Sequence, residues 1–102
     1  MRIDKYLKLV GAFKSREQAR KACNEGFVRV NGEKVKPSRS VSVGEVIEIE
    51  TPVRLLKLRV LAIPKGNVSK KDRLKFAEIM EDRHIKPHET SGFWDELPGE
   101  EL

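Results

Sequence analysis

The chain has 102 residues, 38% hydrophobic and 36% charged, with a formal net charge of +5. This length suits one domain and excludes a multidomain enzyme. The basic balance favours a polyanionic partner, either nucleic acid or an anionic membrane surface, and the longest apolar runs fall far short of the ~20 residues of a membrane-spanning helix.

Two short helices are predicted at the start of the chain. Residues 2–10 carry apolar side chains at the i, i+3, i+4, i+7 spacing of one helical face, and Gly11 is expected to end this helix. Ser15 and Gln18 have the spacing of a capping box. They predict a second helix over about 15–25, with small apolar residues on its inner face and Gly26 as its C-terminal cap.

A small antiparallel sheet of about four or five strands is predicted over residues 27–63. The pair Asn31-Gly32 separates two short β-type runs. It is a strong hairpin signal, because both positions of a type I′ turn need positive φ. Further strands are predicted over 46–50 and 53–63, which are rich in β-branched and other apolar residues.

A C-terminal extension is predicted over 64–102, after a first domain over 1–63 that contains the two helices and the sheet. The extension should contain a helix over about 69–83 and then a flexible acidic tail. In that tail, Phe93 and Trp94 form either a partner-binding anchor or a hydrophobic contact with the domain. The fold class is therefore α+β, with two N-terminal helices packed on the sheet and a C-terminal helix and tail following.

Residues that support catalysis or metal binding are sparse. Cys23 has no histidine within the first 63 residues and is predicted to be a small core residue. His84 and His88 have a spacing that can ligate a metal on one helical face, but Pro87 lies between them and no third ligand is evident. We therefore predict no enzymatic activity, no catalytic residue, no metal site and no cofactor.

The compartment is predicted from the cysteine count and from the first residues. One cysteine excludes an intrachain disulfide and fits a reducing compartment. Charged residues occur every two or three positions from Arg2 onward, where a signal peptide would have an apolar stretch. We expect a cytoplasmic protein.

Positive charge is concentrated in the first third of the chain. Residues 1–39 have a net charge of +7, residues 40–63 are neutral, and residues 64–102 have a net charge of −2. Arg2 and Arg16 are predicted at helix starts, where free N–H groups and arginine side chains both bind phosphate. A basic nucleic-acid-binding face is therefore expected.

Two structural roles compete with RNA binding for these basic residues. They could form a solvated helix surface, and Arg16 could pair with Glu17 or Asp4. Few aromatic residues are available for base stacking, so structured RNA recognised by backbone and shape is the expected ligand. A membrane surface is disfavoured, because no basic amphipathic helix carries large apolar residues.

Five motifs in order resemble the S4 RNA-binding domain, which is named after a protein of the small ribosomal subunit. They cover residues 1 to about 50, and the sheet extends the match to about 63. One departure is Glu45, where the family more often has Asp. The motifs are Arg2-Ile3-Asp4-Lys5-Tyr6-Leu7, Lys14-Ser15-Arg16-Glu17-Gln18-Ala19, Gly26-Phe27-Val28-Arg29-Val30-Asn31-Gly32, Lys36-Pro37-Ser38 and Val43-Gly44-Glu45.

The resemblance implies a small stand-alone member, similar to those of ribosome recycling and ribosome quality control, because no catalytic domain fits after residue 63. Such a protein would bind large-subunit ribosomal RNA and tRNA on obstructed 50S subunits, and we expect it to be a monomer when free. The alternative is an RNA-binding accessory subunit of a separate RNA-modifying enzyme. The predicted RNA-binding residues are Arg2, Lys5, Lys8, Lys14, Ser15, Arg16, Arg20, Asn31, Gly32, Lys34 and Lys36.

Overall fold

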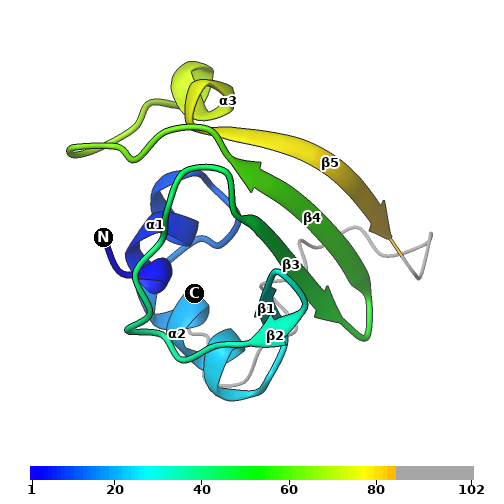
Figure 1. The fold of residues 1–102 in the computed structure, drawn as a ribbon. Helices are drawn as coiled ribbons and strands as arrows, with labels where there is room; N and C mark the ends of the chain where they lie inside the picture. The colour runs from blue at the N-terminus through cyan, green and yellow to red at the C-terminus, as the bar shows by residue number, and fades with distance from the viewer. Residues whose placement is uncertain (85–102) are drawn as a thin grey trace.

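The computed structural model describes residues 1–84, which form an α+β fold built on one five-stranded antiparallel sheet (Figure 1). The strand order is β2-β1-β3-β4-β5, and α1 and α2 lie together on one side of the sheet. The elements are α1 (Ile3–Leu9), α2 (Arg16–Asn24), β1 (Val28–Val30), β2 (Glu33–Lys34), β3 (Val46–Thr51), β4 (Arg54–Val60), the 3-10 turn η1 (Lys70–Asp72), α3 (Arg73–Phe76) and β5 (Ala77–His84).

The ends of α1 and α2 confirm the predicted capping residues. Ser15 Oγ accepts a hydrogen bond of 3.1 Å from the backbone N–H of Gln18 at the start of α2. Gly11 and Gly26 have φ values of +84° and +81° and follow the last turns of α1 and α2. At each end, backbone N–H groups return to the last turn in a Schellman motif, as when Gly26 N donates to Cys23 O.

The hydrophobic core lies between the two helices and the inner face of the sheet. Strands β3 and β4 bury alternate residues, and Ile47 pairs with Leu58 across the two strands. Tyr6 and Phe13 fill the core from the helical side and are almost fully buried. Cys23 is buried as predicted, and this burial, with the nearby charge of Asp4, raises the pKa of the thiol to about 12.

The hairpin between β1 and β2 is also confirmed. Asn31 and Gly32 have φ values of +51° and +89°, and Val30 pairs with Glu33 on either side of this two-residue turn. The Asn31 backbone N–H donates to Val46 O at 2.9 Å, and its Oδ1 accepts from Val46 N at 3.2 Å. The turn is therefore fixed to the start of β3.

The prediction of a helix over about 69–83 is wrong for its second half. Helical turns end at Phe76, and Ala77–His84 pairs antiparallel with β4. Without this partner, β4 would present a row of unpaired backbone groups at the sheet edge. The pairing also places Asp82 beside Arg54, with two charge-assisted hydrogen bonds of 2.8 and 2.7 Å. Pairing with β4 therefore outweighs the weak helical pattern.

The predicted acidic tail lies outside the described residues, and so do His88, Phe93 and Trp94. Those predictions therefore stay predictions. Within residues 1–84, no helix is long and apolar enough to cross a membrane. The same residues contain no group of three or more His, Cys, Asp or Glu side chains that could hold a metal ion.

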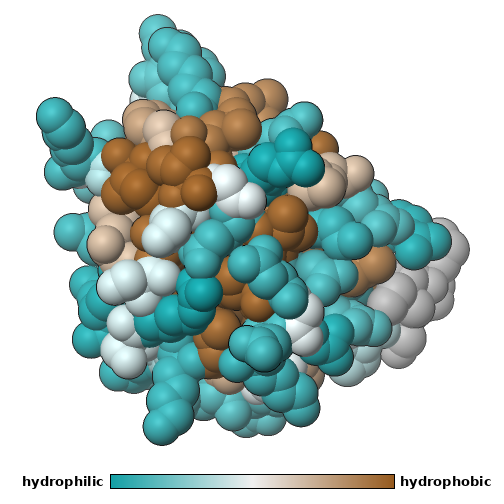
Figure 2. All heavy atoms as spheres, in the orientation of Figure 1, coloured by the Kyte–Doolittle hydropathy of each residue, from teal (hydrophilic) through white to brown (hydrophobic). Residues whose placement is uncertain are grey.

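Hydrophilic side chains cover most of the face drawn in Figure 2. On the face drawn in Figure 2, hydrophobic side chains gather mainly in the upper part of the view, near α3. In the described part of the chain, the exposed large hydrophobic residues are Val43, Leu61, Leu74, Ile79 and Met80.

Tyr6 joins α1 to the segment that leads into β5. Its hydroxyl donates a hydrogen bond of 2.8 Å to Phe76 O, and burial raises the pKa of this phenol. We expect Tyr6→Phe to lower the free energy of unfolding by about 1 kcal/mol, the typical net contribution of one such bond. Urea denaturation measures this change, and an unchanged midpoint and slope would show that the bond contributes nothing to stability.

Candidate RNA-binding surface

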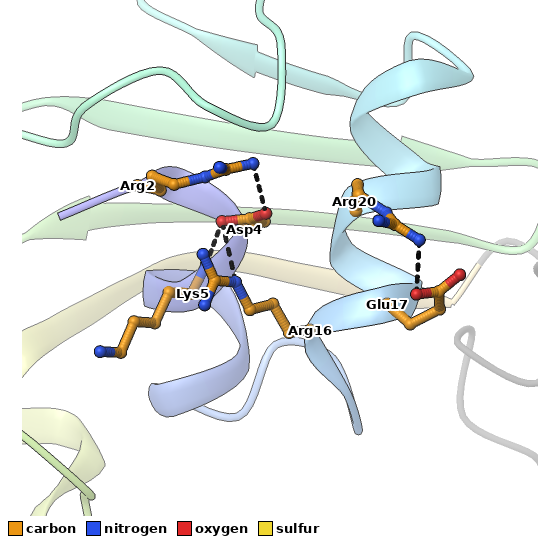
Figure 3. Close-up of polar contacts among 6 residues, drawn as sticks. All are labelled: Arg2, Asp4, Lys5, Arg16, Glu17 and Arg20. Atoms are coloured by element: carbon orange, nitrogen blue, oxygen red, sulfur yellow. Dashed lines mark hydrogen bonds and ion pairs between the residues drawn. The ribbon is translucent and has the colours of Figure 1, made fainter.

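A buried carboxylate organises the basic side chains at the starts of α1 and α2. Asp4 is 2% exposed and accepts a hydrogen bond of 2.7 Å from the backbone N–H of Lys5. It also pairs with Arg2 Nη2 at 3.2 Å and with Arg16 Nε at 3.3 Å. Figure 3 shows both guanidinium groups directed toward this one carboxylate, so Asp4 fixes the positions of both cations.

Arg2 and Arg16 remain accessible while paired with Asp4. Their side chains are 49% and 48% exposed. A guanidinium has five N–H donors, and the contact with Asp4 engages one nitrogen of each group. The predicted alternative of an Arg16–Asp4 pair is thus confirmed, yet donors are left that can contact a phosphate.

A shallow cavity of about 260 Å³ opens beside this carboxylate. It is lined by Arg2, Asp4, Arg16, Glu17 and Arg20. Arg20 forms an exposed ion pair with Glu17 one turn away on α2 (Figure 3). Exposed pairs of this kind are weak, so Arg20 can exchange Glu17 for a phosphate at little cost.

The loop between β2 and β3 holds the start of α1 in place. Ile3 N donates to Arg39 O at 2.7 Å, and Asp4 N donates to Pro37 O at 3.3 Å. Arg2 also forms an isolated antiparallel bridge with Ser40. The position of the arginine pair therefore depends on the conformation of this loop.

An ion pair fixes that loop internally. Arg39 Nη1 and Nη2 donate to the two carboxylate oxygens of Glu45 at 3.0 and 2.7 Å, and the backbone N–H of Ser42 donates to Glu45 Oε1 at 2.8 Å. The Arg39 guanidinium holds the pKa of Glu45 below its ordinary value, and the Ser42 bond lowers it further. Glu45 is the position at which the sequence departs from the usual motif.

Acid should remove this contribution to stability. Because the folded-state pKa of Glu45 is lowered, its contribution is complete above the ordinary value of 4.5 and is lost as the pH falls through the folded-state value. Between pH 7 and pH 3 we expect the wild-type protein to lose about 0.5–1 kcal/mol more unfolding free energy than Glu45→Gln. Urea denaturation of both proteins at both pH values checks this, and an identical pH dependence would contradict it.

Of the other predicted binding residues, Lys5 and Ser15 lie next to the pair formed by Arg2 and Arg16, whereas Lys8 and Lys14 do not. Lys5 is exposed on α1 beside Asp4, and Ser15 is engaged in capping α2. Lys8 and Lys14 line a different pocket, together with Asn67, Val68, Lys70 and Arg73.

The hairpin lies near the far end of α2. A Cβ built on Gly26 would lie 3.3 Å from Lys34 Nζ, so this lysine lies beside the C-terminal cap of the helix. The nine residues of α2 span about 13 Å at the helical rise of ~1.5 Å per residue. Asn31, Gly32, Lys34 and Lys36 are all exposed. Lys34 and Lys36 therefore give the hairpin region its own positive charge, at a distance from Arg2 and Arg16.

Sequence reasoning missed the organising role of Asp4, Arg39 and Glu45. The sequence pattern identifies Asp4 only as an acidic residue in the first turn of a helix, or as an ion-pair partner of Arg16. Its burial depends on α2 packing against α1, which no local motif specifies. The available signal was a carboxylate between two apolar residues, Ile3 and Tyr6, which are one turn apart on the buried helix face.

Known proteins share both the sequence pattern and the fold. A family model described as the S4 domain matches residues 1–47. The RQC P-site tRNA stabilizing factor of Helicobacter pylori is 42% identical over 73 residues, covering 71% of this chain and 87% of that protein. A Streptococcus pneumoniae protein of the same name is 33% identical over 86 residues, covering 84% and 97%. The trimeric structure of Vibrio cholerae heat shock protein 15 has a TM-score of 0.72 at 25% identity, covering 78% of this chain and 80% of that chain.

Proposed function

The chain belongs to the S4-domain family of RQC P-site tRNA stabilizing factors, and from this premise we propose that it binds large-subunit ribosomal RNA and tRNA on obstructed 50S subunits. It acts there in ribosome-associated quality control of stalled nascent chains. The observation that carries this proposal is the pair of half-exposed arginines held on the buried Asp4 carboxylate.

Preorganisation explains how so small a surface can bind RNA. A free arginine side chain loses rotamer freedom when it binds, at a cost of about 0.5–1.5 kcal/mol. Arg2 and Arg16 are already held by Asp4, so part of that cost is met on folding. Their remaining N–H donors suit phosphate, which guanidinium groups contact with two parallel hydrogen bonds.

Recognition on this surface uses backbone and shape rather than base stacking. Tyr6 and Phe13 lie in the core, and Phe27 is partly buried against it. None of these three rings forms the exposed platform that single-stranded RNA requires. Structured ribosomal RNA and tRNA are therefore the ligands that this surface fits best.

The proposed role needs no catalysis. The buried Cys23 thiol has a raised pKa and stays protonated at neutral pH, so it is no nucleophile. We also propose that the protein is a monomer when free and acts in the cytoplasm, where ribosomal subunits are found.

Electrostatic binding should be salt-dependent. If the surface neutralises about five phosphates, log affinity should fall against log salt with a slope of roughly −3.5 to −4.5. Equilibrium binding to tRNA and to isolated large-subunit ribosomal RNA between 50 and 300 mM KCl (about a sixfold range) measures this slope. An affinity that is independent of salt would contradict the proposed mechanism.

A pull-down separates this function from the accessory-subunit alternative. Recovery of 50S particles with the tagged chain supports the proposal. Recovery of one enzyme in stoichiometric amount, without ribosomal RNA, would favour an accessory subunit of an RNA-modifying enzyme.

A further inference from the structure

A separate basic pocket lies at the opposite end of α1 from the arginine pair. It has a volume of about 510 Å³ and is formed by the end of α1 and the connection to α2, together with Asn67, Val68, Lys70 and Arg73. Four cationic side chains line it, from Lys8, Lys14, Lys70 and Arg73. Within residues 1–84, no acidic side chain contributes to its lining.

Arg73 lies directly against the backbone of Gly11. A Cβ built on Gly11 would lie 2.5 Å from Arg73 Nη1 and 2.8 Å from Nε, so only glycine permits this approach. Arg73 Nε is buried and has no hydrogen-bond partner among the described residues. A buried donor without an acceptor is unfavourable, and an anionic ligand in the pocket would supply the missing acceptor.

The carboxylate next to Arg73 in sequence is engaged elsewhere. Asp72 accepts a hydrogen bond of 2.9 Å from Ser69 Oγ and pairs with Lys75 Nζ at 3.2 Å. Arg73 and Lys70 thus lie in the pocket without a carboxylate in its lining to balance them. Several cations around one polar cavity are the usual setting for phosphate.

We propose that this pocket binds a phosphate group of the RNA, so that residues 67–73 extend the binding surface beyond the residues matched by the S4 domain. The identity of the ligand as RNA rests on the proposed function. The seven residues of α1 span about 10 Å, so a single folded RNA can contact both the arginine pair and the pocket. Residues 67–73 would then provide a second point of contact with the same RNA.

The test compares two double variants of the full chain that lose the same charge. Lys70→Gln/Arg73→Gln removes two cations of the pocket, and Lys65→Gln/Lys71→Gln removes two that do not line it. At 150 mM KCl (about physiological) the pocket variant should bind tRNA or large-subunit ribosomal RNA about tenfold or more weakly. Its salt slope should be shallower by about 0.7–0.9, as for one lost phosphate contact. The control should stay within about threefold of wild type.

Nuclear magnetic resonance with inorganic pyrophosphate provides a second measurement on the unmodified chain. The Gly11 amide and the Arg73 Nε–H resonances should shift on titration, and the Gly11 amide should stay unchanged in the pocket variant. If they do not shift in the wild-type chain, the pocket is no phosphate site and the proposal is overturned.

These outcomes separate the pocket from the proposed function. If Arg16→Glu abolishes RNA binding while the pocket variant binds as its control does, the pocket proposal fails and the function stands. If the wild-type chain binds no RNA, the function and the RNA assignment of the pocket fail together. Thermal unfolding of each variant confirms that a lost affinity is not lost folding.

Discussion

Arg16→Glu is expected to weaken binding to tRNA-bearing 50S subunits by about 100-fold or more. The substitution removes charge-assisted hydrogen bonds of about 1.5–3 kcal/mol and adds repulsion toward the phosphate. It also places a second carboxylate beside the buried Asp4, which lies 3.3 Å from Arg16 Nε. Equilibrium binding with labelled protein measures the loss.

Lys65→Glu is the matched control, because it reverses one exposed charge that lines neither the arginine cavity nor the basic pocket. It should change the affinity by less than about threefold. Arg16→Gln, which leaves no new repulsion, should still lose about tenfold. Equal losses for Arg16→Glu and Lys65→Glu would show that the binding face is assigned wrongly.

Asp4→Asn should weaken RNA binding by about tenfold even though it makes the chain more basic. The amide is neutral and cannot hold both Arg2 and Arg16 as the carboxylate does. Both arginines then lose their fixed positions and incur the full ordering cost on binding. We also expect the unfolding free energy to fall by about 1–2 kcal/mol, because the charge-assisted hydrogen bonds of the buried carboxylate are lost.

Glu17→Gln makes the same change in charge on the surface. Its partner Arg20 is half-exposed, and the pair contributes little to stability. This control should bind RNA as tightly as wild type or slightly more tightly. If Asp4→Asn also binds more tightly, net charge rather than positioning governs affinity, and the proposed role of Asp4 is wrong.

Features set by local chemistry were predictable from the sequence. The Ser15 cap, the left-handed glycines after α1 and α2, and the Asn31-Gly32 hairpin each depend on a few neighbouring residues. The β5 strand depends instead on the free edge of β4, which lies more than a dozen residues away in sequence. The composition of this segment fits a helix and a strand almost equally well. Its strand conformation is therefore determined by pairing with the edge of β4.

The candidate site divides in the same way. Charge density and motif order predicted Arg2 and Arg16 as RNA-binding residues, because each belongs to a recognisable pattern. The pairing of both with Asp4 needs the two helices in contact. Arg73 and Gly11, which are in contact in the basic pocket, are 62 positions apart in the sequence. The spacing of residues along one helix or strand therefore could not predict this pocket.

Gradient sedimentation with purified ribosomal particles tests the central claim most directly. The wild-type chain is incubated with 50S subunits that carry peptidyl-tRNA, with empty 50S subunits and with 70S ribosomes, and Arg16→Glu serves as the control. We predict that the wild-type chain migrates with the tRNA-bearing 50S subunits and that Arg16→Glu stays at the top of the gradient. Migration with 70S ribosomes alone, or with none of the particles, would contradict this account.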